Sequence, residues 1–333
     1  MKPIRVIQYG LGPIGCAAVR AMLEKKGIEI VGAIDIDPDK AGRDLGEVAG
    51  VGKPVGVKVS GDAGSVFRKS RAQVVVHTTQ SFFRDVYDQL QGCVLSGLNV
   101  VSSTEELLYP QLKNPALAAR MDRLAKKHRA TLLGTGVNPG FVMDTLAVVL
   151  TGVCTSVRSI RIVRRVDAAT RRMPLQRKVG AGMKPDAFRA LVRKGRLGHI
   201  GLTESMALLA AGLNWKVTMK QQIEPILSET ALQTQYFSIA AGDVAGLKHT
   251  GAAFMRGKKV IDLDLRMYIG AQEPMDEIEV DGAPPLHLVM KGGIAGDEAT
   301  VSALVNGVPA VLNGDPGLKT MLDLPVPRLF PAV

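Results

Sequence analysis

The sequence has few cysteines, few aromatic residues and no long apolar run. The three cysteines among 333 residues are widely spaced and odd in number, so they form neither a disulfide framework nor a metal-ligand pattern. No apolar run of about 18 residues occurs, and the N-terminus shows no apolar segment followed by a small-residue cleavage site. These absences predict a cytoplasmic protein with no membrane partner.

Positive charge is concentrated in one part of the chain. Residues 156–200 carry 13 lysines and arginines against two acids, Asp167 and Asp186, and this stretch accounts for the whole net charge of +11. No nucleic-acid recognition motif accompanies the charge, so we expect no nucleic-acid partner. The stretch can meet an anionic substrate group, a cofactor phosphate or only solvent.

The first half of the chain alternates strand-like and helix-like segments. Residues 4–9 and 28–34 are short apolar strand patterns, and residues 15–26 between them have helical spacing. The alternation continues with strands at 73–77, 99–102 and 130–133, and helices at 85–96 and 114–128. This order predicts an α/β fold of the Rossmann type, a doubly wound parallel sheet.

A second pattern begins after this region. Residues 157–166 and 259–267 partly alternate apolar and polar side chains, as half-exposed antiparallel strands do, and residues 184–215 contain helices. A helix over 296–313 precedes a proline-rich tail without a strand pattern, and we expect both to pack on the first domain. The predicted ranges are 1–143 for an NAD(P)-binding domain, 144–293 for an α+β substrate domain with a largely antiparallel sheet, and 294–333 for the returning segment.

A glycine-rich turn follows the first strand and opens the first helix. Gly10, Gly12 and Gly15 satisfy the G-x-G-x-x-G pattern, with Pro13 and Ile14 inside it. The first glycine permits a tight turn, the second lets the backbone approach a diphosphate, and the third lets helix and strand pack closely. The diphosphate would rest on N–H groups at the helix N-terminus. The context predicts a nicotinamide dinucleotide cofactor.

Asp35 lies twenty residues after Gly15, at the end of the second predicted strand. There its carboxylate can accept hydrogen bonds from the ribose hydroxyls of NAD, and its charge would repel a 2′-phosphate. Ile36 follows where NADP enzymes often have arginine, so NAD is favoured over NADP. Lys40 and Arg43 leave dual use open. The alternative is that Asp35 is only a turn residue before the next Asp-Pro pair.

Polar residues follow three of the predicted parallel strands, at the sheet edge where ligands bind in this fold. They are Thr78 and Thr79, Ser103 with Glu105 and Glu106, and Asn138 with Phe141. We expect the hydroxyl residues to line the cofactor. One of the two acids is expected to face a cleft, while the other faces solvent or a helix N-terminus. The alternative is that both acids only begin the next helix.

The five histidines are scattered and form no ligand cluster with cysteine, so no metal site is expected. Each histidine is expected to be structural or exposed. His77 is the best exception, because it ends a strand at the ligand-binding edge.

The motifs together resemble one family, the 2,4-diaminopentanoate dehydrogenases, to which the native amine dehydrogenases belong. The resemblance rests on VIQYGLGPIG, GAIDIDP, SSTEELLYP, GTGVNPGF, RRMPLQRKVGAG and GGIAGDEATVSALVNGVPAVL. It covers nearly the whole chain and implies distant kinship with dihydrodipicolinate reductase. It implies an NAD(P)-dependent amine dehydrogenase that forms a primary amine reversibly from a small ketone or aldehyde and ammonia. It also implies a homodimer formed through the sheet of the second domain.

The resemblance suggests roles for particular residues. The acid that serves the chemistry is Glu105 or Glu106, and we favour Glu105. Asn138 and Phe141 would line the nicotinamide side and the substrate pocket, and Asn306 would approach the cofactor.

Two other functions remain open from the sequence. The first is a dehydrogenase of a diamino acid such as 2,4-diaminopentanoate, in which arginines near 161–172, among them Arg164, would hold a carboxylate. The second is a dinucleotide-sensing binding protein that uses the basic stretch for a partner. The histidine-pair and P-S-G-T-A motifs of dihydrodipicolinate reductase are absent, which disfavours that activity.

Overall fold

The computed structural model describes residues 2–169 and 171–330. Residues 1, 170 and 331–333, which fall within the three predicted domain ranges, lie outside the described residues. The chain forms two compact units, Met1–Phe141 together with Ala295–Val333, and Val142–Ile294. Among the described residues, no helix has both the length and the apolar character needed to cross a bilayer.

The first unit is built on a seven-stranded sheet with the order β15-β6-β5-β4-β1-β2-β3, in which all neighbouring strands are parallel. The strands are β1 (Ile4–Tyr9), β2 (Ile28–Ile34), β3 (Val59–Ser60), β4 (Val74–His77), β5 (Asn99–Ser102), β6 (Thr131–Gly134) and β15 (Gly317–Lys319). The central strands are buried on both faces, which explains their continuous apolar runs. This arrangement confirms the predicted Rossmann-type sheet.

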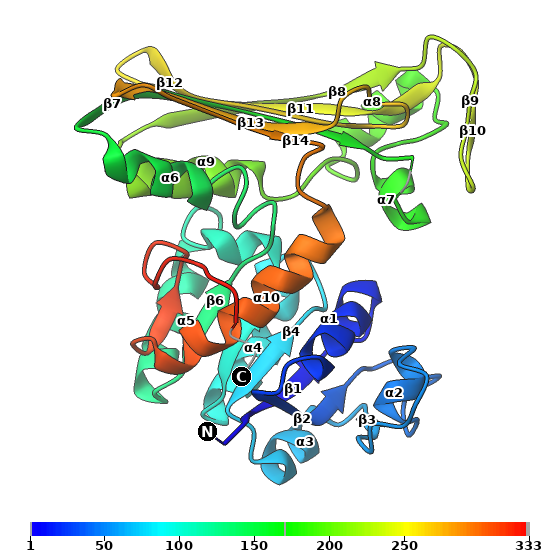
Figure 1. Ribbon diagram of the computed structural model, residues 1–333, viewed down its shortest axis with the longest axis vertical. Coiled ribbons are helices and arrows are strands. Elements are labelled where there is room, and N and C mark those ends of the chain that lie inside the picture. The colour runs from blue at the N-terminus through cyan, green and yellow to red at the C-terminus, as the bar shows by residue number, and fades with distance from the viewer. Residues whose placement is uncertain (1, 170, 331–333) are drawn as a thin grey trace. The chain divides into compact units, whose positions relative to one another are not determined.

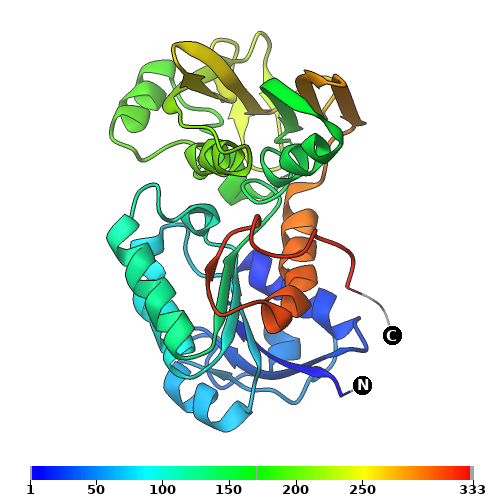
Figure 2. The ribbon, with the colours of Figure 1, turned by 90° about the vertical axis from the view of Figure 1, so that its left-hand side faces the viewer.

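Helices cover both faces of this sheet (Figures 1 and 2). They are α1 (Pro13–Leu23), α2 (Leu45–Val48), α3 (Ala63–Ser70), α4 (Phe83–Leu95), α5 (Pro115–Lys127) and α10 (Gly296–Asn313), with a short 3₁₀ helix, η1 (Glu105–Leu108). Apolar residues of α1 and α10 share one buried cluster, exemplified by Met22 and Val308, and those of α4 and α5 share another, exemplified by Leu90 and Met121. The two clusters lie on opposite faces because successive strand residues alternate.

The C-terminal segment contains a strand that the sequence analysis missed. β15 pairs in parallel with β6 at the edge of the sheet. The Leu318 N–H donates to Asp122 Oδ1 over 3.1 Å, and Thr131 Oγ1 donates to the carbonyl of Gly314 over 3.1 Å. The expectation of a tail without strands was wrong, because three residues are too few to show a strand periodicity.

The second unit contains a six-stranded sheet with the order β14-β13-β7-β12-β11-β8. Its strands are β7 (Ser156–Asp167), β8 (Thr218–Leu227), β11 (Val244–Met255), β12 (Lys258–Tyr268), β13 (Met275–Ala283) and β14 (Leu286–Lys291). Only β7 and β12 pair in parallel, so the predicted largely antiparallel sheet is confirmed. A separate hairpin is formed by β9 (Leu232–Gln233) and β10 (Ser238–Ile239).

One face of the six-stranded sheet carries helices α6 (Thr145–Leu150) and α9 (Leu202–Gly212) (Figure 1). The short 3₁₀ helix η2 (Thr151–Val153) follows α6. Helix α9 packs on β8, β11 and β12 and is apolar almost all round. Two further helices, α7 (Met173–Lys178) and α8 (Pro185–Arg193), follow β7 in the chain.

Candidate functional site

The glycine turn between β1 and α1 is shaped by contacts that exclude side chains. Gly10 has φ +93°, and a Cβ there would lie 2.6 Å from the carbonyl oxygen of Thr78. A Cβ on Gly15 would lie 2.0 Å from the carbonyl oxygen of Gly10, so the helix can approach the turn only with glycine at this position. By contrast, nothing lies within 4 Å of a Cβ on Gly12. The turn therefore presents its backbone to open space at its middle glycine.

The N-terminus of α1 suits an anion. Gly12 is the N-cap residue, no side chain caps the helix, and proline follows within the first turn. The early N–H groups of a helix have no partner inside the helix, and the helix dipole attracts negative charge to them. The cradle at Gly12 and the N–H groups from Ile14 onward fit the diphosphate of a dinucleotide.

Two side chains, the buried Gln8 and the half-buried Thr78, hold this turn by hydrogen bonds. Gln8, fully buried in β1, donates from Nε2 to the carbonyl of Gly10 and to Thr78 Oγ1, both over 2.9 Å. Thr78 Oγ1 also donates to the carbonyl of Gly10 over 2.9 Å. The sequence analysis missed Gln8, although a glutamine within an apolar strand was a possible signal. Thr78, expected to line the cofactor, holds the turn in place.

Asp35 contacts the glycine turn as well as its own segment. Its Oδ2 accepts a hydrogen bond from the Leu11 N–H over 2.7 Å, and its Oδ1 accepts one from the Asp37 N–H over 2.9 Å. A carboxylate has about four acceptor positions, so Asp35 can accept hydrogen bonds from ribose hydroxyls in addition to those from the two backbone N–H groups. Ile36 is 83% exposed, which is unusual for isoleucine and suits an apolar contact with an adenine ring.

The two adjacent acids after β5 have different environments. Glu106 is buried, and its Oε2 accepts a hydrogen bond from the Phe83 N–H over 2.9 Å and a longer one from Asn114 over 3.4 Å. Lys113 lies 3.5 Å from its Oε1. Glu105 is half-buried. Consecutive side chains of a 3₁₀ helix point about 120° apart, so η1 directs the two carboxylates differently. Glu106 thus serves the N-terminus of α4.

His77 is a structural residue. Its Nδ1 lies 2.9 Å from Ser102 Oγ, and its Nε2 lies 2.9 Å from Gln89 Oε1 and 3.0 Å from Thr79 Oγ1. Burial lowers the pKa of His77 to about 4, so the ring is neutral at physiological pH. The Ser103 N–H donates to the carbonyl of His77 over 3.0 Å. These bonds fasten the ends of β4 and β5 to each other.

The same network fixes the loop that carries Glu105. Ser102 Oγ donates to Thr104 Oγ1 over 3.0 Å, and Thr104 Oγ1 donates to the carbonyl of Gln80 over 2.8 Å. The sequence analysis did not identify this network, because the contacts join residues more than twenty positions apart. Its effect is to hold Glu105 on a rigid segment at the carboxyl end of β5.

Asn138 offers an acceptor beside the end of β6. Its Oδ1 is buried and has no hydrogen-bond partner among the described residues. A buried carbonyl oxygen is normally paired, so this atom fits a ligand that brings an N–H donor, such as the carboxamide of nicotinamide. Phe141, also expected near the substrate, is half-buried at the end of the first unit's first segment.

Asn306 makes a different contact from the expected one. Its Oδ1 accepts a hydrogen bond from the Phe330 N–H over 2.8 Å, which attaches the C-terminal tail to α10. The Phe330 ring lies against Gly27, where a Cβ would come within 3.0 Å of it. One acceptor position of the carboxamide oxygen is therefore occupied by the tail, and a cofactor contact of Asn306 stays a prediction.

Arg164, expected in the substrate pocket, forms a buried ion pair. Its Nη1 lies 2.8 and 2.7 Å from the carboxylate oxygens of Asp276, and its Nη2 donates to the carbonyl of Ile294 over 2.7 Å. Burial lowers the pKa of the Arg164 guanidinium and raises the pKa of the Asp276 carboxyl. The contacts tie β7 to β13 and to the end of the second unit. Arg164 uses these donors within the protein, and its place in a substrate pocket stays a prediction.

The second unit also contains two histidines that each have a buried ring nitrogen. His199 Nε2 and His249 Nδ1 are buried and have no hydrogen-bond partner among the residues described. Burial, followed by the positive charges of Lys178, His249 and Arg164, lowers the pKa of His199 well below its ordinary value. We refer to Lys178, His199, His249 and Arg164 as the basic cluster. The sequence analysis treated these histidines as scattered, because they are fifty positions apart.

Much of the basic stretch pairs with acids of the second unit. β13 runs antiparallel to β7 and places acids opposite its arginines. The pairs include Arg158 with Asp281, Arg161 with Glu279, Arg164 with Asp276, and Lys184 with Asp243. Two of these four pairs, Arg158 with Asp281 and Arg161 with Glu279, are exposed on both sides, so part of the stretch faces solvent.

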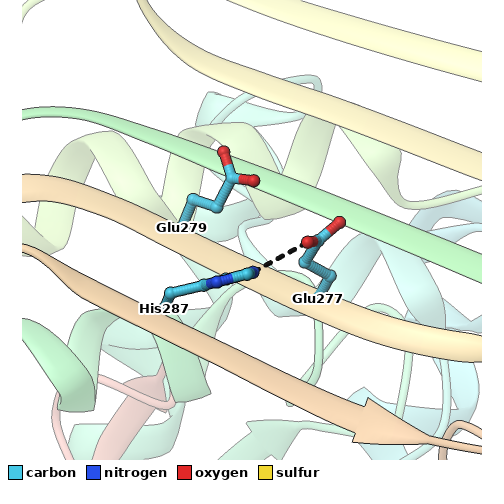
Figure 3. Close-up of side chains that lie close together, drawn as sticks. All are labelled: Glu277, Glu279 and His287. Carbon is cyan, nitrogen blue, oxygen red and sulfur yellow. Dashed lines mark hydrogen bonds and ion pairs between the residues drawn. The ribbon is translucent and has the colours of Figure 1, made fainter.

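Glu277, Glu279 and His287 form the one group in the described part of the chain with the spacing of metal ligands (Figure 3). His287 Nε2 lies 2.8 Å from Glu277 Oε1. Arg161 Nη1 lies 3.0 Å from Glu279 Oε1 and 3.7 Å from Glu277 Oε2. Since the guanidinium supplies positive charge to both carboxylates, we interpret the group as a cross-strand charge network.

Comparison with known protein families divides the chain in two parts. Residues 141–332 match the family described as the 2,4-diaminopentanoate dehydrogenase C-terminal domain. Residues 4–121 match the N-terminal part of dihydrodipicolinate reductase.

Individual proteins resemble the chain over almost its whole length. A 2,4-diaminopentanoate dehydrogenase of Acetoanaerobium sticklandii is 34% identical over 98% of this chain and 95% of its own. An amine dehydrogenase of Streptomyces virginiae is 22% identical over 97% of this chain and 96% of its own. Among solved structures, an amine dehydrogenase from Mycobacterium smegmatis has a TM-score of 0.87 and 28% identity, covering 99% of this chain and 98% of that one.

Proposed function

Since the chain belongs to the 2,4-diaminopentanoate dehydrogenase family and is an NAD(P)-dependent oxidoreductase, we propose that it catalyses reductive amination of a small ketone or aldehyde with ammonia, reversibly. The observation that carries the proposal is the position of Glu105. It follows β5 at the sheet edge that also holds the glycine turn after β1, and β4 alone separates these strands. The neighbouring Glu106 is buried and accepts the Phe83 N–H at the start of α4, so we assign the chemistry to Glu105 rather than to Glu106.

Four features of the first unit would hold the cofactor. Gly12 and the N-terminus of α1 would bind the diphosphate, Asp35 the adenosine ribose, and Asn138 Oδ1 the nicotinamide carboxamide. The dinucleotide, when bound, supplies or accepts the hydride. We propose NAD as the preferred form, because Asp35 and Asp37 place two carboxylates where a 2′-phosphate would lie.

Glu105 would act as the proton carrier of the reaction. Its carboxylate takes one proton from ammonium and leaves ammonia to form the C–N bond with the carbonyl carbon. A proton moves from nitrogen to the carbonyl oxygen and gives the neutral carbinolamine. Glu105 then returns its proton to the hydroxyl group, which departs as water. The remaining C=N group is cationic, and the carboxylate stabilises it for reduction.

Activity assays on paired variants test the proposal. The purified protein should reduce NAD in the presence of a small primary amine at alkaline pH. Glu105→Gln should lower the rate by roughly 10²-fold or more, the range typical of a lost general base, while calorimetry still detects dinucleotide binding. Glu106→Gln is the matched control and should keep most of the rate.

Retained activity in both variants would exclude an acid from this segment as the base. Amine-dependent NADH formation would also exclude a purely dinucleotide-sensing role.

The basic cluster favours a second candidate substrate, an amine that carries a carboxylate. The cluster combines the exposed Lys178 with two buried imidazole nitrogens, and such donors suit an anionic group. We propose a diamino acid as this alternative. Turnover of a simple amine should be compared with that of the corresponding amino carboxylate. If Lys178→Met raises KM for the carboxylate alone, the alternative is supported. A strong preference for the uncharged amine contradicts it.

We also propose a cytoplasmic homodimer formed through the second unit's sheet. Helices α6 and α9 lie against one face of that sheet (Figure 1). The sheet also carries exposed charged pairs such as Arg161 with Glu279, which a second copy of the chain can contact. Light scattering on the purified chain should give twice the mass of 35.4 kDa. A monomer at micromolar concentration contradicts the proposal.

A further inference from the structure

Lys40 lies between two carboxylates beside the glycine turn. Its Nζ is 3.3 Å from Asp35 Oδ2 and 3.2 Å from Asp37 Oδ2, and its side chain is 26% exposed. Although burial lowers it, the hydrogen bonds and charges of Asp37 and Asp35 raise the pKa of Lys40 above its ordinary value. The ammonium group is therefore charged and paired, yet it remains accessible to a ligand.

The three side chains differ in how firmly they are held. Asp35 accepts backbone N–H groups on both oxygens, from Leu11 and Asp37, so its carboxylate cannot turn without losing both bonds. Its side chain is 11% exposed. The Lys40 ammonium is held by ion pairs and hydrogen bonds to the carboxylates of Asp35 and Asp37, at the end of a flexible four-carbon chain. Lys40 is consequently the member of the group that can move.

The local charges explain why its movement matters. Asp35 and Asp37 outnumber Lys40, so the three groups together carry one negative charge. A phosphate monoester brings roughly two further negative charges near neutral pH. The other cation of this segment, Arg43, pairs with Glu47 over 2.7 Å and donates to the carbonyl of Asp39 over 3.2 Å. Lys40 is therefore better placed than Arg43 to meet a phosphate beside Asp35.

We propose that Lys40 determines the ratio of NADP to NAD affinity. With NAD bound, Lys40 stays between Asp35 and Asp37 and offsets their charge. With NADP bound, its ammonium leaves Asp35 and binds the 2′-phosphate of the adenosine ribose. The chain thus uses both dinucleotides and prefers NAD. This inference rests on the proposed dinucleotide site.

Calorimetric titration of the purified chain with NAD⁺ and NADP⁺ tests the role of Lys40. The readout is the ratio of the two dissociation constants, Kd for NADP⁺ divided by Kd for NAD⁺. Lys40→Met should raise this ratio about tenfold or more, because a hydrogen bond to an ionised partner contributes at least that factor. Lys40→Arg should keep the ratio near that of the native chain. Arg43→Met is the matched control and should leave it unchanged.

A second variant acts in the opposite direction and does not remove the cation. Asp37→Asn deletes one carboxylate beside Lys40, so it should lower the ratio. Titration with ADP and 2′,5′-ADP isolates the adenosine end and should reproduce both effects. The proposal is overturned if Lys40→Met leaves the ratio unchanged, or if Arg43→Met raises it as much. If the native chain binds neither dinucleotide, the proposed function itself is wrong.

Discussion

The Glu106 carboxylate accepts a hydrogen bond from the backbone N–H of Phe83, 2.9 Å away, at the first residue of α4. The N-cap position of this helix is Phe82, whose side chain cannot cap. An acid from another element therefore satisfies the helix start and adds a favourable charge to its dipole. The two consecutive glutamates thus have separate duties, one in folding and one, as proposed, in proton transfer.

Truncation of Glu106 should therefore lower stability. Glu106→Ala leaves the buried Phe83 N–H without this acceptor, so the free energy of unfolding should fall by about 1–3 kcal/mol. Urea denaturation followed by circular dichroism measures it. Glu47→Ala is a suitable control, because Glu47 pairs with Arg43 on the surface, where such pairs contribute about 1 kcal/mol or less. Equal losses in the two variants would contradict a capping role.

Variants of two glycines in the turn should distinguish an effect on dinucleotide binding from an effect on folding. Gly12→Ala adds a methyl group to open space, so the variant should fold with nearly native stability but lose dinucleotide affinity by about tenfold or more. Gly15→Ala would put a Cβ 2.0 Å from the Gly10 carbonyl oxygen, so it should lower the melting temperature as well. Thermal unfolding and calorimetry on both variants distinguish the two effects. If the Gly12→Ala variant is destabilised but binds the dinucleotide with native affinity, Gly12 is not part of the diphosphate site.

The sequence was sufficient to predict the fold of both units and the family, and comparison with known proteins confirms both. The glycine turn could be found because its requirements are local. Gly10, Gly12 and Gly15 lie within six positions, and a side chain on Gly10 or Gly15 would collide with atoms within or next to the turn. The acids after β5 could also be found, because ligands bind at the carboxyl ends of parallel strands.

The remaining site features depend on contacts that a single sequence does not display. The side chains of Arg164 and Asp276 meet across two strands, 112 positions apart. The sequence shows that an arginine is present, but it does not show that a buried carboxylate pairs with it. Sequence separation also hid the contact of Asn306 with the tail and the hydrogen bond from Gln8 to Thr78, 70 positions away.

Removing one partner of the buried pair of Arg164 and Asp276 should destabilise the protein more than replacing both partners with apolar residues. Arg164→Met leaves the Asp276 carboxylate buried without its cation, which should lower the free energy of unfolding by about 3–5 kcal/mol. The double variant with Asp276→Leu should recover a large part of that loss, because neither charge is then buried. Urea denaturation of the single and double variants provides the comparison. If the double variant is as unstable as Arg164→Met, the pair is not the origin of the loss.

Two buried histidines should make the protein less stable in mild acid. Burial lowers the pKa of both His77 and His249 to about 4, whereas the unfolded chain protonates them near 6.5. Between these values the unfolded state binds protons that the native state does not bind. The contribution of each histidine is therefore fully present above pH 6.5 and is lost progressively as the pH falls toward 4. For each of the two residues the loss approaches about 3 kcal/mol.

Single variants assign this pH dependence to individual residues. His77→Gln cannot take up the proton, so the free energy of unfolding should fall less between pH 7 and pH 4.5 than in the native chain. His249→Gln should reduce the slope in the same way, even though it lies in the other unit. Urea denaturation at several pH values gives the slopes, and the comparison does not depend on the absolute stability of each variant. A native slope in both variants would mean that other groups cause the acid sensitivity, such as Asp44 and Asp281, whose carboxyl pKa values are lowered by hydrogen bonds from the backbone and from Arg158, respectively.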